Sequence, residues 1–86
     1  VYKISIIHIM TFKNKYNAIF KKILKIKDLN KIKLANTKNT EKWDSLTHLR
    51  LITELENVFN ITFKPNEILK IHSYDAGIKI IKKKIK

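Results

Sequence analysis

The chain contains no cysteine, and it has only one glycine and one proline in 86 residues. Without cysteine it can form neither disulfide bonds nor metal sites with thiolate ligands. So little glycine and proline argue against a sheet-rich fold with many tight turns, and against a glycine-rich phosphate loop. No apolar run approaches the roughly 20 residues needed to span a bilayer. The length and these absences together favour one small domain with a modest core.

Acidic residues are also scarce, since seven of them face nineteen lysines and arginines and leave a net charge of +12. Such a charge is typical of proteins that bind nucleic acid or anionic membranes. The excess is uneven, because residues 1–40 hold ten lysines and one aspartate. Residues 41–60 instead hold four acidic residues against Lys42 and Arg50. The positive charge therefore avoids the middle of the chain.

The segment 45–59 has the clearest helical pattern, because its apolar residues return every three or four positions. These apolar residues are Leu46, Leu49, Leu51, Ile52, Leu55, Val58 and Phe59. Asp44 and Ser45 precede them, and both residue types favour the start of a helix. We therefore expect a helix over 45–59 that buries one face and exposes the Ser45 hydroxyl at its first turn.

The sequence WDSLTHLRLITELENVFNITF, with its Asp44-Ser45-Leu46 motif, resembles the free-standing bacterial acyl carrier proteins. The resemblance extends from about Thr11 to Ile85. It implies an all-α, four-helix bundle with a short third helix and a long loop between the first two helices. It also implies that residues 11–86 form the carrier domain and that residues 1–10 are an N-terminal extension, with Met10 as a candidate natural start.

In that family the serine of the motif carries a 4′-phosphopantetheine arm through a phosphodiester. The resemblance thus implies a covalent cofactor on Ser45, with Asp44 beside it, and a protein without catalytic activity of its own. The implied partners are a phosphopantetheinyl transferase and the enzymes that load and transfer the acyl or aminoacyl group. It further implies a cytoplasmic monomer that neither spans a membrane nor binds nucleic acid specifically.

The chain departs from the common fatty-acid carriers at positions that meet partner enzymes. Those carriers usually have acidic residues two and five positions after the serine, where this chain has Thr47 and Arg50. The glycine that usually precedes the motif is replaced by Trp43. We expect docking through Thr47, Arg50, Glu54 and Glu56, and a dedicated biosynthetic pathway rather than ordinary fatty-acid synthesis.

Around the central helix, the pattern predicts three further helices. The first begins at Thr11 or Asn14 and buries the stripe Tyr16, Ile19, Phe20, Ile23 and Leu24. A brief helix over 66–70 follows Pro65, and Ser73 precedes a last helix over 74–83. We expect the last helix to direct Ile78, Ile81 and Ile85 inward.

The connection over 25–42 is long for so small a domain. We expect Leu29, Ile32 and Leu34 to anchor it to the core, and Trp43 to act as a hydrophobic staple at the start of the next helix. Residues 1–10 alternate loosely between apolar and polar, which suits a strand or an unstructured arm.

Other functions explain less of the sequence. A small basic nucleic-acid-binding protein accounts for the charge, but its stacking aromatics would have to lie outside the apolar stripes. His48 is near Ser45 and could activate a serine nucleophile, but no Gly-x-Ser-x-Gly elbow or oxyanion loop accompanies it. A scaffold with an inert Ser45 is the third alternative. The histidines show no spacing typical of a metal site.

Overall fold

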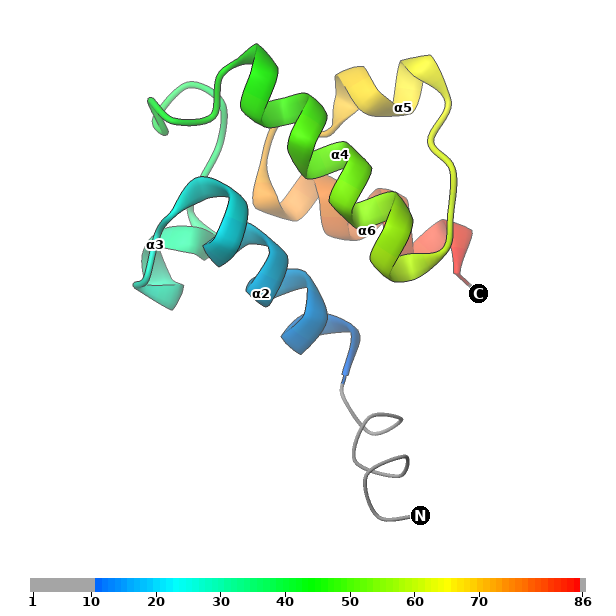
Figure 1. The fold of residues 1–86 in the computed structure, drawn as a ribbon, viewed down its shortest axis with the longest axis horizontal. Helices are drawn as coiled ribbons and strands as arrows, with labels where there is room; N and C mark the ends of the chain where they lie inside the picture. Colours follow the sequence, from blue (N-terminus) through cyan, green and yellow to red (C-terminus); the bar gives the residue numbers. More distant parts are fainter. Residues whose placement is uncertain (1–10, 86) are drawn as a thin grey trace.

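The computed structural model describes residues 11–85, which form five helices and no strand (Figure 1). The helices are α2 (Phe12–Leu24), α3 (Leu29–Lys33), α4 (Ser45–Phe59), α5 (Pro65–Lys70) and α6 (Tyr74–Lys84). The all-α class expected from the sequence is therefore confirmed. The expectations for residues 1–10 lie outside the described residues.

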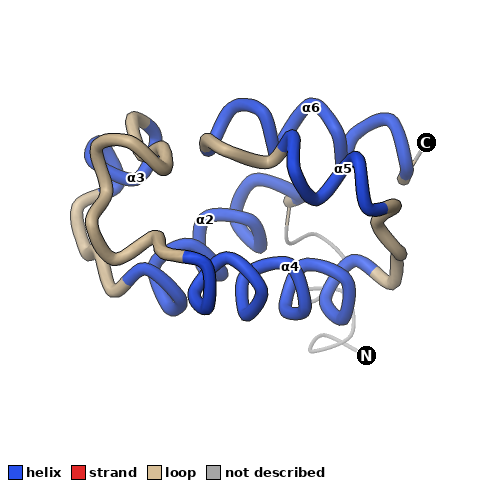
Figure 2. The backbone as a smooth tube through the Cα atoms, turned by 90° about the horizontal axis from the view of Figure 1, so that it is seen from above, coloured by secondary structure: helices blue, strands red, loops and turns tan. Residues whose placement is uncertain are grey.

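Helix α2 begins at Phe12 because the Thr11 hydroxyl accepts a hydrogen bond from the backbone N–H of Asn14 (3.1 Å). It ends at Lys25, which adopts a left-handed conformation with a φ of 57°. The predicted stripe is buried apart from Ile23, which is only half-buried. α2 packs against α4 and α3, and Figure 2 shows α4 along one side of the molecule with α5 and α6 along the other.

The connection after α2 contains a helix that the sequence analysis missed. Asp28 caps α3, because its carboxylate accepts a hydrogen bond from the backbone N–H of Asn30 (2.9 Å). Ile32 is fully buried as predicted, but Leu29 and Leu34 are 40% and 74% exposed, so two of the three predicted anchors are wrong. Ala35 is buried beside Ile32, whereas Leu29 at the first position of α3 and Leu34 at its C-terminal cap stay exposed.

The segment that follows α3 is held against the start of α6. Asn36 and Ser73 form an isolated antiparallel bridge, in which the Thr37 N–H donates to the His72 carbonyl (2.9 Å). The Tyr74 N–H donates to the carbonyl of Ala35 (3.0 Å). These bonds join two parts of the chain that lie far apart in sequence.

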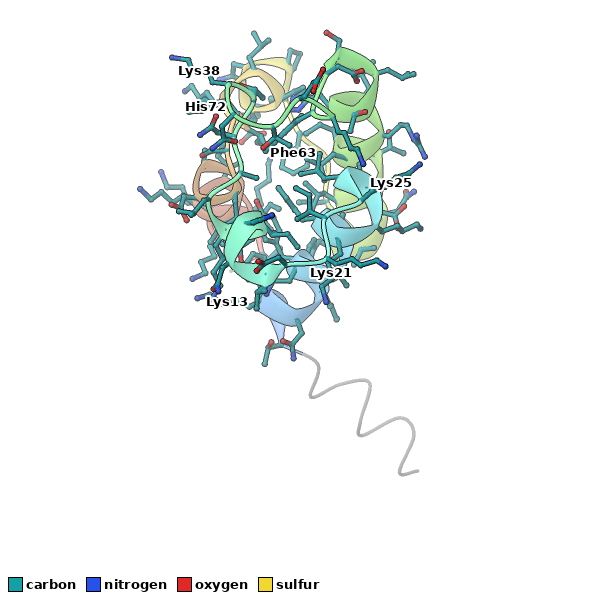
Figure 3. The ribbon with its side chains drawn as sticks, turned by 90° about the vertical axis from the view of Figure 1, so that its left-hand side faces the viewer. Lys13, Lys21, Lys25, Lys38, Phe63 and His72 are labelled. Carbon is teal, nitrogen blue, oxygen red and sulfur yellow. The ribbon has the colours of Figure 1, made fainter. Side chains whose placement is uncertain are left out.

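The core between the three longer helices is rich in aromatic rings. The Tyr16 ring lies 4.6 Å from that of Phe20, which meets the rings of Trp43 and Tyr74 edge-on at about 5.5 Å. The Tyr16 hydroxyl donates to the Tyr74 carbonyl (2.7 Å), and burial raises its pKa far above the usual value. Phe63 points into the same interior, while Lys13, Lys21 and Lys25 lie on the outside (Figure 3).

Helix α4 spans the predicted range, but its buried face is narrower than predicted. Leu51, Ile52 and Leu55 are buried. Three other residues expected on that face are exposed, namely Leu46 (69%), Leu49 (58%) and Val58 (40%). The inward position of the first turn belongs to His48, so neighbouring apolar residues of the arc face outward.

Helices α5 and α6 follow the sequence closely at their starts. Pro65 is the first residue of α5, and the Ser73 hydroxyl caps α6 by accepting the Ala76 N–H (3.0 Å). Of the residues predicted to face inward from α6, Ile81 is fully buried and Ile78 is half-buried. Ile85 is 41% exposed, so its predicted burial is wrong, because the helix ends before it.

Candidate functional site

Ser45 is the first residue of α4 and is exposed to solvent. Within residues 11–85, no hydrogen bond involves its hydroxyl. Its backbone is fixed, because α4 is a helix of 15 residues whose inner face is buried in the core. Figure 1 shows the start of α4 at the same edge of the molecule as α5. Ser45 therefore presents a free hydroxyl from a rigid element.

Asp44 caps this helix, as the sequence predicts. Its carboxylate accepts the backbone N–H of Thr47 (2.9 Å) while its own backbone stays extended. The Thr47 N–H, and then the Thr47 side chain, lower the pKa of the Asp44 carboxyl below its usual value. Asp44 is therefore an anion beside the Ser45 hydroxyl at neutral pH.

Trp43 and His48 form a pair across the first turn of α4. The indole Nε1–H donates to His48 Nδ1 (3.0 Å), and the two rings are stacked 6.1 Å apart. Trp43 thus precedes the cap and contacts the fourth helical residue, which is the staple geometry predicted for it. A histidine takes the place of the usual apolar partner.

The pairing also fixes the protonation of His48. An indole N–H can only donate, so Nδ1 is the acceptor and the proton of the neutral ring resides on Nε2. Nε2 lies 2.9 Å from the Ile68 carbonyl and donates to it. Both ring nitrogens are thus occupied, so His48 has no free nitrogen with which to accept a proton from Ser45. The geometry gives His48 a structural role at the start of α4.

A surface depression of about 400 Å³ borders Ser45. It is formed by the start of α4, the end of α5, and the two segments joined by the Asn36–Ser73 bridge. Its lining residues are Thr37, Trp43, Asp44, Ser45, His48, Leu69, Ile71 and His72. Nothing in the sequence places Thr37 and His72 beside Ser45, because backbone bonds between distant segments bring them there.

The four residues expected to dock partners all belong to α4, but they differ in availability. Arg50 is exposed and Thr47 is half-buried. Glu54 forms an ion pair with Lys22 of α2 (3.2 Å), and Glu56 accepts the backbone N–H of Phe63 (2.9 Å). Both carboxylates thus have bonds within the chain, and their docking role stays a prediction.

Exposed leucines also lie near Ser45, although the sequence predicts Leu46 and Leu49 on the buried face of α4. Leu46 and Leu49 lie on the outer face of α4, and Leu69 of α5 is 81% exposed. The apolar periodicity of α4 includes the first two but cannot show how wide the buried face is. The area around Ser45 is therefore more apolar than its predicted polar docking residues suggest.

Two kinds of structural feature are absent from residues 11–85. No group of three or more histidine, cysteine or acidic side chains there could hold a metal ion. Among the helices of the same part of the chain, none is long and apolar enough to cross a membrane. Comparisons with protein-family models, with curated proteins and with solved structures found no match to this chain.

Proposed function

We propose that the protein is an acyl carrier protein that bears 4′-phosphopantetheine on Ser45. The observation that carries this proposal is the exposed Ser45 hydroxyl at the first position of α4, within the Asp-Ser-Leu motif, which has no hydrogen-bond partner among residues 11–85. A tethered arm needs a rigid attachment point with open space around it, and α4 supplies both. The five-helix arrangement, with a long connection before α4 and a short α5 after it, is compatible with a carrier bundle.

The residues around Ser45 fit the chemistry of attachment. The Ser45 oxygen would form a bond to the phosphorus of coenzyme A that carries pantetheine, as the bond to the departing adenosine bisphosphate breaks. The hydroxyl proton would pass to a base of the transferase, because His48 has no free nitrogen. The thiol of the attached arm supplies the group that carries an acyl or aminoacyl unit as a thioester.

The same geometry favours a carrier over a hydrolase. A serine nucleophile needs a base within hydrogen-bonding reach and donors for the developing oxyanion. His48 is held by Trp43 and Ile68, and Asp44 is engaged with the Thr47 N–H. Ser45 is therefore better suited to accept a group from a partner enzyme than to catalyse a reaction itself.

Nucleic-acid binding remains the alternative, and the placement of the aromatic rings argues against it. Binding of single strands relies on exposed rings on which bases stack. Within the described part of the chain, Tyr16, Phe20, Trp43 and Tyr74 are at most 3% exposed. The lysines alone would give attraction to phosphate without base stacking.

Intact-mass measurement tests the proposal directly. The protein is incubated with coenzyme A, Mg²⁺ and a broad-specificity phosphopantetheinyl transferase. We expect its mass to increase by one phosphopantetheine group, and we expect no increase for Ser45→Ala. Circular dichroism should show the same helix content in both proteins, because Ser45 lies on the surface. An unmodified wild-type protein, or a modified Ser45→Ala protein, would refute the assignment.

A further inference from the structure

The connection 25–42 concentrates positive charge on one side of the molecule. Six lysines in this segment face two acidic residues, Asp28 and Glu41. All six lysine side chains are exposed, namely Lys25, Lys27, Lys31, Lys33, Lys38 and Lys42. The Asp28 carboxylate is engaged in the cap of α3. Figure 3 faces this side of the molecule, with Lys25 and Lys38 on the outside. A partner that approaches from this side therefore meets an excess of cations.

The same connection exposes two leucines on a well-fixed backbone. Leu34 is 74% exposed and Leu29 is 40% exposed. The Leu34 carbonyl accepts a hydrogen bond from the Asn39 side-chain amide (2.9 Å), and the Leu34 N–H donates to the Lys31 carbonyl (3.2 Å). Ile32 and Ala35, on either side in the sequence, are anchored in the core. Because Leu34 is already held in place, covering it with an apolar partner costs little chain freedom.

A surface depression brings the leucine and the lysines together. It has a volume of about 460 Å³ and lies between the end of α2 and the connection. Its apolar lining residues are Leu24, Ile26 and Leu34, and its cationic ones are Lys31 and Lys42, with Glu41 as the acidic residue. Together with the exposed residues next to them in the chain, these define what we call the lysine–leucine surface: Lys25, Lys27, Leu29, Lys31, Lys33, Leu34 and Lys42.

The composition of the lysine–leucine surface favours an anionic lipid membrane over a nucleic acid. Lysines attract the phosphates of both. Binding of single strands also uses aromatic rings on which bases stack, and residues 25–42 contain no aromatic residue. Exposed aliphatic side chains can instead enter the boundary between headgroups and acyl chains, while the long lysine side chains keep their ammonium groups at the phosphates.

We propose that the lysine–leucine surface binds the surface of an anionic lipid membrane, with Leu29 and Leu34 inserted between lipids and the lysines paired with lipid phosphates. The inference goes beyond the carrier function and does not depend on it. Ser45 does not line the depression next to Leu34, so the proposed contact makes no use of the Ser45 hydroxyl.

Co-sedimentation of the whole chain with lipid vesicles tests the inference. The vesicles consist of phosphatidylcholine alone, or of phosphatidylcholine and phosphatidylglycerol in equal parts, at about 0.1 M salt. We expect the protein to sediment with the anionic vesicles only, and less so as salt is added, because salt screens the attraction between lysines and phosphates. Soluble glycerophosphoglycerol offers the same phosphate without acyl chains, so an equal concentration of it should not displace the protein. Failure to bind the anionic vesicles, or displacement by the soluble headgroup, would overturn the inference.

A matched pair of leucine variants identifies the part of the surface that inserts. Leu34→Ser should weaken binding to the anionic vesicles roughly tenfold, because most of that side chain would otherwise leave water. Leu69→Ser also removes an exposed leucine, but Leu69 belongs to α5 and lies outside the lysine–leucine surface, so we expect little change. Circular dichroism checks that both variants keep their helices. Equal effects of the two substitutions would contradict the assignment of Leu34.

A matched pair of lysine variants separates local contact from net charge. Lys31→Gln combined with Lys33→Gln should weaken vesicle binding roughly fivefold for each lysine removed. Lys79→Gln combined with Lys83→Gln makes the same change of net charge on α6, outside the lysine–leucine surface, and we expect a smaller loss. Equal losses would show that binding follows net charge alone, and the proposed surface would be wrong.

Oligonucleotide binding by Leu34→Ser distinguishes a membrane surface from a nucleic-acid surface. A leucine adds nothing to the attraction between lysines and phosphates, so Leu34→Ser should bind a single-stranded oligonucleotide as the wild-type protein does. If this substitution weakened oligonucleotide binding as much as vesicle binding, the lysine–leucine surface would be assigned to nucleic acid and the membrane proposal would fail. All these measurements use the protein with an unmodified Ser45, so their outcome leaves the carrier function to its own test.

Discussion

At the scale of single residues, two polar side chains next to Ser45 stabilise the start of α4. Asp44 caps α4, and His48 joins Trp43 to the Ile68 carbonyl. The Ser45 hydroxyl differs from them, because it has no partner among the described residues. A surface serine without a structural task can be modified without disturbing the fold, which is what attachment of a large group requires.

The core offers a sharp test at Tyr16 and Gly77. A Cβ at position 77 would collide with the Tyr16 hydroxyl, so we expect Gly77→Ala to destabilise the protein by about 1–3 kcal/mol, as overpacking does. Tyr16→Phe removes the buried bond to the Tyr74 carbonyl and should lower the free energy of unfolding by about 1 kcal/mol. Urea unfolding followed by circular dichroism measures both changes.

The double variant separates a specific collision from a general loss of helix stability. Tyr16→Phe removes the atom that the new methyl group would meet, so the combined change should destabilise the protein by less than the sum of the single changes. Strict additivity would show that the hydroxyl is not what requires glycine at position 77.

The residue scale also shows what sequence can and cannot predict. The caps at Asp44 and Ser73 follow from local chemistry and are confirmed, and of the two predicted starts of α2, Thr11 and Asn14, the structure shows Thr11. The position of Thr37 and His72 next to Ser45 depends on a bridge between segments more than 30 residues apart. Local sequence carries no signal for such a contact.

At the scale of elements, the bounds of the helices with a clear apolar period could be predicted from the sequence. The short helix within the connection 25–42 could not. α4 has the predicted bounds, and α5 and α6 differ from prediction by one residue. α3 was missed because five residues are too few for an apolar period to appear. The exposed face of α4 was misjudged because periodicity gives the direction of the apolar arc but not how much of it other helices cover.

We expect partner enzymes to dock on helix α4. The charges on this helix should therefore change the rate at which these enzymes modify Ser45. Arg50 is exposed on α4, so Arg50→Glu should raise the rate at which a generic fatty-acid-type transferase modifies Ser45. The effect of one exposed charge should be modest, roughly twofold to fivefold, and should shrink with added salt. Initial rates at several salt concentrations measure it.

The controls for Arg50→Glu follow from the ion pairs within the chain. Lys21→Glu on α2 makes the same change of charge and should leave the rate nearly unaltered, whereas Lys22 is unsuitable because it pairs with Glu54. Glu56→Gln keeps an oxygen that can accept the Phe63 N–H, so a slower rate there would reflect the lost charge and not a lost bond. An equal effect of Lys21→Glu and Arg50→Glu would mean that docking does not use α4.

At the scale of the whole molecule, the net charge of +12 is not reduced by internal pairing. The ion pairs found among residues 11–85, Lys22–Glu54 and Lys84–Glu67, each remove one positive and one negative charge together. Exposed lysines remain on α2 and at the end of α6, where the Lys82 ammonium lies 5.9 Å from the centre of the Phe12 ring of α2. The excess positive charge is therefore carried by exposed lysines that can attract phosphate groups.

Such a distribution predicts weak nucleic-acid binding without sequence preference. Because attraction to phosphates releases counterions, the logarithm of the affinity should fall linearly with the logarithm of the salt concentration. Fluorescence anisotropy with duplex and single-stranded oligonucleotides of matched and scrambled sequence measures both properties. Sequence-selective binding that persists at about 0.15 M salt would favour the nucleic-acid alternative, since attraction between lysines and phosphates cannot account for it. Binding that vanishes at that salt concentration would leave the lysines without a role in nucleic-acid recognition.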